Sequence, residues 1–180
     1  MNAKKCNAIL HLHRVTYERN LYNLCMPTVQ FLKQQVWSRD WGEEHLVIHT
    51  ERFTGKLLKM KKGTRGGLQY HQKKDEAGYL ISGEMSVEYD DGSGKLLSRK
   101  LGPGDSLYIP PGAVHRETAL TDCVIFEISN PVFNDRVRVE EKYGEKIESG
   151  MPSTKLEDVK EGGPQVLAEL LSNPQYQLKK

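Results

Sequence analysis

The chain has 180 residues, which is enough for one domain with additional segments at its ends. Lys and Arg total 26 and Asp and Glu total 24, so the formal charge is only +2 and no basic excess indicates nucleic-acid binding. Three widely spaced cysteines without a Cys-x-x-Cys pair argue against a disulfide framework and favour a reducing compartment. No apolar run is long enough to span a bilayer. We therefore expect a cytoplasmic protein that binds neither nucleic acid nor membrane.

The sequence divides into three parts in chain order. Residues 1–35 are expected to form a loosely held N-terminal extension. Residues 36–145 contain the strand-like segments, and residues 146–180 form a polar linker followed by a short helix that starts near Pro164. One face of this helix is apolar and carries Val166, Leu167, Leu170 and Leu171. We expect that face to pack on the rest of the domain or on a partner.

The middle part reads as short strands separated by turns rich in Gly, Pro and Asp. The strand-like segments lie at 44–50, 53–60, 67–71, 78–82, 84–90, 95–101, 105–110 and 123–129. Short strands at near-regular spacing predict an all-β sandwich or barrel. The segment DDGSG at 90–94 stands between two alternating runs and predicts a hairpin.

Four side chains in this part have the chemistry of metal ligands. Gln69 and His71 are two residues apart, so in a strand they point to the same face. Glu76 follows after a turn, and His115 follows a second turn further along the chain. Two imidazoles, a carboxylate and an amide oxygen suit one divalent metal ion (Zn²⁺, Mn²⁺, Fe²⁺, Co²⁺ or Ni²⁺, with Zn²⁺ or Mn²⁺ favoured) and leave positions open for water or substrate.

These residues lie in two segments that resemble the two motifs of the cupin superfamily. The first motif spacing is matched by Gly63, Gln69, His71, Glu76 and Gly83, with Gln69 in place of the first histidine. The second is matched by Gly104, Pro110, Gly112 and His115, with Ala119 where Asn is usual. The resemblance implies a single cupin barrel, also called a double-stranded β-helix or jelly roll, with short helical ends.

A longer stretch, from Trp41 to Gly144, resembles the cupin isomerase domain of type II mannose-6-phosphate isomerases. The shared features are Trp41-Gly42, Lys56, Leu68-Gln69-Tyr70-His71, Ile109-Pro110, His115-Arg116, Asp135-x-x-Arg138 and Tyr143-Gly144. Gln in the first ligand position is a trait of that family, whereas Lys74 stands where the family often has Arg. The resemblance implies a metal-dependent sugar-phosphate isomerase acting on mannose 6-phosphate or a related sugar, with the counterparts of Lys56 and Arg138 in the active site.

Aldose–ketose isomerisation requires an electrophile, a base and, for a phosphorylated sugar, a cationic clamp. The metal would serve as the electrophile, and the resemblance makes Lys56 and Arg138 the candidates for the clamp. Lys56 shares strand parity with Leu58 and Met60, so its side chain is expected to point into the barrel. A lysine buried there would require an acid or a ligand beside it. Glu127 is a candidate base, although its position in the strand does not decide whether its side chain points into or out of the barrel.

Two other functions remain open from sequence. A non-catalytic cupin that binds a sugar or another small molecule is favoured by Ala119 and by Glu145, which stands where Arg is usual. A different metal-dependent cupin enzyme, such as a dioxygenase or decarboxylase, is disfavoured by Gln69, because those proteins usually resemble the two-histidine motif. We also expect a homodimer, since the exposed edges of a sheet need cover.

Overall fold

The computed structural model describes residues 28–148 and 150–172. The expected N-terminal extension lies outside the described residues as far as residue 27. From Leu32 onward the described residues belong to one compact unit, and this unit contains every element described below. Residues 28–34 have no regular secondary structure.

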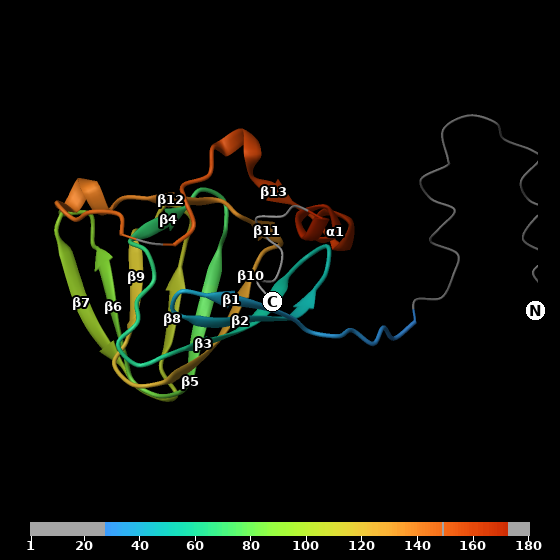
Figure 1. Cartoon of the computed structure of the whole chain (residues 1–180), viewed down its shortest axis with the longest axis horizontal. Coiled ribbons are helices and arrows are strands. Elements are labelled where there is room, and N and C mark those ends of the chain that lie inside the picture. Colours follow the sequence, from blue (N-terminus) through green and yellow to red (C-terminus); the bar gives the residue numbers. More distant parts are fainter. Residues whose placement is uncertain (1–27, 149, 173–180) are drawn as a thin grey trace, which may run out of the picture. The chain divides into compact units, whose positions relative to one another are not determined.

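Two antiparallel sheets face each other and form a barrel (Figure 1). The six-stranded sheet consists, in spatial order, of β1 (Gln35–Arg39), β2 (Gly42–His49), β3 (Thr54–Met60), β10 (Cys123–Ser129), β5 (Glu76–Ser82) and β8 (Ser106–Ile109). The five-stranded sheet consists of β12 (Arg136–Arg138), β4 (Gln69–His71), β9 (His115–Ala119), β6 (Met85–Asp90) and β7 (Leu96–Leu101). The expected all-β barrel is therefore confirmed.

Local sequence explains the sharp reversals between these strands. Asp90 closes the β6–β7 hairpin, because its Oδ1 accepts hydrogen bonds from the backbone N–H groups of Gly92 and Gly94 at 2.8 and 3.0 Å. Gly83 joins β5 to β6 with a φ of 88°, and a Cβ there would lie 2.2 Å from the carbonyl oxygen of Asp122. Only glycine fits such a position without strain.

The barrel has an apolar half and a polar half. Its core is formed by Met60, Leu80, Met85, Val87, Leu101, Ala119, Cys123 and Ile125. Strand β5 contains Glu76 and the core residue Leu80, and strand β9 contains His115 and the core residue Ala119. Both pairs are four residues apart, so each strand places both members of its pair on the inner face. The same strands that anchor the core therefore carry polar side chains to the other half of the barrel.

Short helices and one further strand pair complete the unit. The helices are η3 (Glu140–Tyr143), η4 (Leu156–Asp158) and α1 (Pro164–Ser172), and β11 (Val132–Phe133) pairs with β13 (Lys160–Glu161). The helix α1 begins at Pro164, and its residue Leu167 lines the cavity described below. Among the described residues, no helix has both the length and the apolar character needed to cross a membrane.

Candidate metal-binding site

Three buried donor groups meet in the polar half of the barrel. The Oε1 atom of Glu76 lies 3.4 Å from Nε2 of His71 and 3.5 Å from Nε2 of His115. The candidate ligand atoms of the three residues all lie within 4.8 Å of one another. They come from β4, β5 and β9, so both sheets contribute to the cluster.

The other ring nitrogen of each histidine is already engaged. Nδ1 of His71 lies 2.6 Å from Oδ1 of Asp135, and Nδ1 of His115 lies 3.0 Å from the carbonyl oxygen of Ala113. Both partners are acceptors, so each Nδ1 carries the proton and donates it. The Nε2 lone pairs are left facing Glu76, which is the arrangement of histidine ligands whose outer nitrogen is held by a carboxylate or a carbonyl.

The charges around the cluster favour the protonation states that a cation requires. Burial alone would raise the pKa of Glu76, but Lys74 and the two histidines outweigh burial and lower it to about 2. Burial lowers the pKa of His71, and the charge of Lys74 lowers it further, although Asp135 acts in the opposite sense. A charged carboxylate at Glu76 therefore faces the His71 imidazole, whose lowered pKa favours the neutral form that metal binding demands.

The chemistry of this donor set fits a divalent cation. Two imidazole nitrogens and a carboxylate oxygen converge on one point, and these atoms are the ligands that divalent transition metals prefer. Gln69 lies opposite His115 in the β4–β9 register and lines the same cavity. Its role as a fourth ligand stays a prediction.

Asp135 is a functional candidate that sequence reasoning missed. It is fully buried and accepts three hydrogen bonds, from Nδ1 of His71 and from the backbone N–H groups of Lys73 (2.9 Å) and Lys74 (2.7 Å). Burial alone would raise the pKa of Asp135, but the hydrogen bond from His71 and the nearby positive charges hold it well below its usual range. The segment Asp135-x-x-Arg138 contributed only to the family resemblance, so the strongest sequence signal for this residue was its match to that segment.

A line of alternating charges runs from the metal cluster across the six-stranded sheet. Nζ of Lys74 lies 3.0 Å from Oε2 of Glu76 and 3.6 Å from Oε1 of Glu127. Nζ of Lys56 lies 3.4 Å from the same oxygen of Glu127 and 3.1 Å from Oε1 of Glu44. Lys56 is buried and has the acid neighbours that its burial required, and Glu127 points to the inside of the barrel.

Arg138 lies at another wall of the same cavity and is tightly held. Its guanidinium group contacts the carboxylate of Glu140 and donates to the carbonyl oxygen of Met151 at 3.2 Å. Glu140 also accepts a hydrogen bond from the backbone N–H of Leu68 at 3.0 Å. The guanidinium group covers Gly67, where a Cβ would lie 2.5 Å from Nε of Arg138.

Glu117 is a second candidate that sequence reasoning missed. It follows His115 by two residues on β9, so its side chain shares the inner face, and it lines the cavity. Burial raises the pKa of Glu117, and the neighbouring His115 only partly offsets that effect. Within the described residues it forms no ion pair with a lysine or arginine. The sequence feature that could have identified Glu117 is its spacing of two residues from His115, which places both side chains on the same face of a strand.

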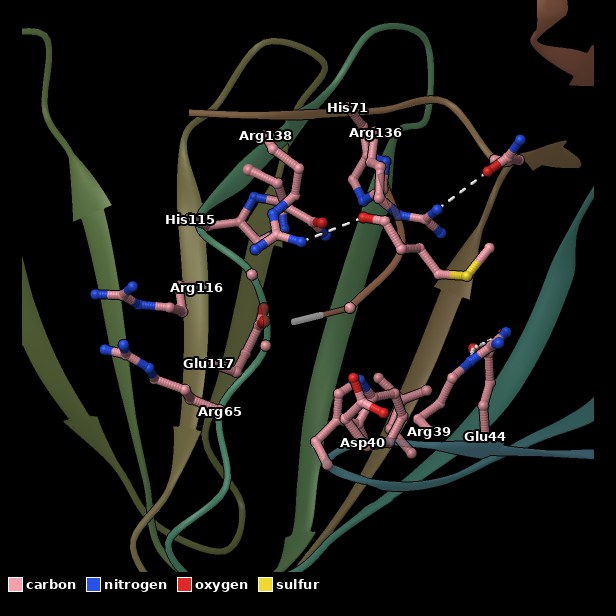
Figure 2. Close-up of a pocket in the computed structure, with 18 of the residues that line it drawn as sticks. Arg39, Asp40, Glu44, Arg65, His71, His115, Arg116, Glu117, Arg136 and Arg138 are labelled. Atoms are coloured by element: carbon pink, nitrogen blue, oxygen red, sulfur yellow. Dashed lines mark hydrogen bonds and ion pairs between the residues drawn. The ribbon is translucent and has the colours of Figure 1, made fainter. Parts of the chain in front are cut away.

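All of these groups open on one cavity of about 500 Å³. The seven residues predicted from sequence all line it, namely Lys56, Gln69, His71, Glu76, His115, Glu127 and Arg138. Figure 2 shows Arg136 and Arg138 beside the two histidines, Glu117 further along the same wall, and Arg39, Asp40 and Glu44 on the opposite wall.

Comparison with known proteins defines the class of this domain. Residues 56–129 match the family described as Cupin domain. Together with the two facing sheets, this match shows that the chain contains a cupin domain.

Among individual relatives, the chain is similar to the alginate biosynthesis protein AlgA of Pseudomonas aeruginosa. The two are 30% identical over 118 residues, which are 63% of this chain and 24% of AlgA. The chain therefore spans about a quarter of that relative's length.

Solved structures with a similar fold include two oxalate decarboxylases. A single-substitution variant of the Bacillus subtilis enzyme is 23% identical with a TM-score of 0.50, covering 58% of this chain and 30% of that one. The formate complex of the Lactobacillus farciminis enzyme is 15% identical with a TM-score of 0.50, covering 60% and 34%. At these identities the likeness concerns the fold alone.

Proposed function

We propose that the protein is a metal-dependent sugar isomerase that acts on mannose 6-phosphate or a related sugar. The observation that carries the proposal is the convergence of Glu76 Oε1 with Nε2 of His71 and of His115 inside a cavity lined by charged side chains. The similarity to AlgA supports the choice of sugar chemistry within the cupin family.

His71, Glu76 and His115 would hold the cation, with Gln69 as the predicted fourth ligand. A divalent cation at this position would supply Lewis-acid polarisation of a carbonyl oxygen. The protein's part is to present the donor atoms already oriented, because Asp135 fixes the ring of His71 before any metal binds.

Proton transfer next to the carbonyl needs a base that is free to move a proton. Glu117 and Glu127 both line the cavity, but Glu127 lies between two lysines whereas Glu117 forms no ion pair within the described residues. We assign the transfer to Glu117 because of its place on the same wall as His115, and we keep Glu127 as the second candidate.

The positively charged groups around the cavity favour an anionic substrate. Lys56 and Arg138, the residues predicted for a phosphate clamp, both line the cavity, and each already contacts a carboxylate. Lys146 also lines it and is exposed to solvent, so it adds positive charge where a phosphate would enter, whereas Arg65 in the same lining already pairs with Glu145 and Glu148. Phosphate oxygens bind well to such side chains.

A coupled assay for the interconversion of mannose 6-phosphate and fructose 6-phosphate tests the proposal. Protein loaded with Zn²⁺ or Mn²⁺ should convert the substrate, and metal-free protein should not.

The Glu117→Gln substitution should lower kcat about 100-fold or more with little change in KM. The matched control is Glu84→Gln, because Glu84 is exposed beside Lys100 and should leave both constants unchanged. Absence of turnover for every hexose phosphate, with each of the five candidate metals, would refute an isomerase.

The matched charges inside the cavity favour a second candidate function, the binding of a sugar without turnover. Lys56, Lys74 and Arg138 each contact a carboxylate, so the cavity can accept a neutral polyol without leaving a charge unpaired. A hexose that raises the melting temperature but is not converted would support this function. Oxygen consumption by Fe²⁺-loaded protein would instead indicate an oxygenase.

A further inference from the structure

We propose that Lys74 is a positioning residue that occupies one oxygen of Glu76, so that only the other oxygen can reach a bound cation. The inference rests on the metal site of the proposed function. Oε1 of Glu76 faces the two histidine Nε2 atoms at 3.4 and 3.5 Å, whereas Oε2 lies 3.0 Å from Nζ of Lys74. The two oxygens of one buried carboxylate therefore have different partners.

Lys74 is fixed in this position from two sides. Its side chain is buried, and its Nζ also lies 3.6 Å from Oε1 of Glu127, which in turn contacts Lys56 at 3.4 Å. Its backbone N–H donates to Oδ2 of Asp135 at 2.7 Å, the same carboxylate that orients His71. Neither the backbone nor the ammonium group can withdraw from Glu76 without leaving a buried charge or a buried hydrogen-bond acceptor without its partner.

A carboxylate can bind a metal ion through one oxygen or through both. An ammonium group on Oε2 competes for that oxygen, so Lys74 keeps Glu76 monodentate and leaves a coordination position for water or substrate. The positive charge of Lys74 also opposes the charge of the cation, so Lys74 limits how tightly the metal is held. Lys74 thus lowers the metal affinity and at the same time keeps one coordination position of the metal open.

Titration of metal-free protein with Co²⁺ tests this inference without an activity assay. The intensity of the visible Co²⁺ absorption falls as the coordination number rises, so it reports whether Glu76 uses one oxygen or two. In Lys74→Met we expect a weaker absorption band per bound Co²⁺ and about tenfold tighter binding. In Lys74→Arg, which keeps the cation, we expect the wild-type spectrum. The matched control is Lys73→Met, which removes the same charge from a half-exposed neighbour paired with Glu161, and it should behave as wild type.

An unchanged spectrum and affinity in Lys74→Met would overturn the inference. If Lys74→Met does not fold, Glu127→Gln gives an independent reading, because it removes the second acid beside Lys74 and leaves Glu76 as its remaining partner. We expect the wild-type spectrum with several-fold weaker Co²⁺ binding, and tighter binding would contradict the inference. If wild-type protein binds no Co²⁺, or binds it no more tightly than the His115→Ala variant does, the metal site of the proposed function is refuted. That result is distinct from a failure of the role of Lys74.

Discussion

At the scale of single residues, Asp135 joins the metal cluster to the backbone that surrounds it. One of its oxygens holds the ring of His71, and the other accepts the N–H groups of Lys73 and Lys74. It also follows Asn134, the one described non-glycine residue with a positive φ, at 52°. A side chain that satisfies three buried donors from this turn compensates for the unfavourable backbone that places it there.

Asp135→Asn should weaken both stability and metal binding. The amide can still accept from His71 through its oxygen, but its NH₂ group would then face two backbone N–H groups that have no other acceptor. We expect a loss of about 2 to 4 kcal/mol in the free energy of unfolding. We also expect about 10- to 100-fold weaker binding of Zn²⁺ or Mn²⁺. Urea denaturation and metal titration measure the two effects.

Asp105→Asn is the control for that experiment. Asp105 also accepts a backbone N–H, from Gly102 at 2.8 Å, but it lies in an exposed turn. Its substitution should cost less than about 1 kcal/mol and should not alter metal binding. If the two variants behaved alike, Asp135 would have no special role at the site.

At the scale of elements, the turn before β4 leaves room for the guanidinium group of Arg138. Gly67 lies under the guanidinium group, whereas at the adjacent Gly66 a Cβ would meet nothing closer than the carboxylate of Glu117, at 3.7 Å. Arg138 belongs to β12, which pairs with β4 through Arg138 and Gln69. The missing side chain at residue 67 thus sets how closely these two strands and the cavity wall pack.

Gly67→Ala and Gly66→Ala should therefore differ sharply. The added methyl group at residue 67 would have to displace a buried arginine that is held by Glu140, which we expect to cost about 1 to 3 kcal/mol in the free energy of unfolding. At residue 66 the same methyl group meets only ordinary contacts, and the change should stay within about 0.5 kcal/mol. Equal effects in thermal or urea denaturation would show that Arg138 does not hold this wall in place.

Sequence alone predicted the strands whose signal is local. All eight expected strand segments contain a strand, and the hairpin at Asp90–Gly94 forms where the turn residues indicated it. Strand β9 was not predicted, because His-Arg-Glu-Thr-Ala lacks apolar alternation and owes its extended conformation to pairing with β6. Strand β1 was also not predicted, and it is held by pairing along its whole length with β2.

The same limit applies to the site. Motif spacing was enough to identify His71, Glu76 and His115 as candidates, because strand parity and turns are local properties. The role of Asp135 depends on which residues lie next to it across the barrel, at a separation of about 60 residues, and the same contact holds the backbone of Lys74 in place. No local pattern in the sequence contains that information.

At the scale of the whole molecule, the polar half of the barrel is held together by buried ion pairs rather than by apolar packing. Such an arrangement should be sensitive to acid. Burial alone would raise the pKa of Glu44, but Lys56 and Arg39 outweigh burial and hold it well below its usual value of 4.5. A lowered carboxylate pKa contributes stability that is fully present above the usual value and is lost as the pH falls below it.

Glu44→Gln should therefore flatten the acid side of the stability curve. In metal-free protein we expect the free energy of unfolding to fall as the pH drops from about 4.5 towards 2, and to fall less steeply in Glu44→Gln. Urea denaturation at a series of pH values measures the slopes. Glu84→Gln, at the exposed pair with Lys100, should keep the wild-type slope. Parallel curves for wild type and Glu44→Gln would contradict this account of the buried charges.

The central claim is that two histidines and one glutamate from facing sheets hold a single divalent cation. Equilibrium dialysis of metal-free protein against Zn²⁺ or Mn²⁺, followed by elemental analysis, tests it most directly. We predict about one ion per chain in wild type and in His45→Ala, which removes a buried histidine outside the site, and loss of that ion in His71→Ala and His115→Ala. Binding of no ion by wild type, or of the same ion by all four proteins, would contradict the claim.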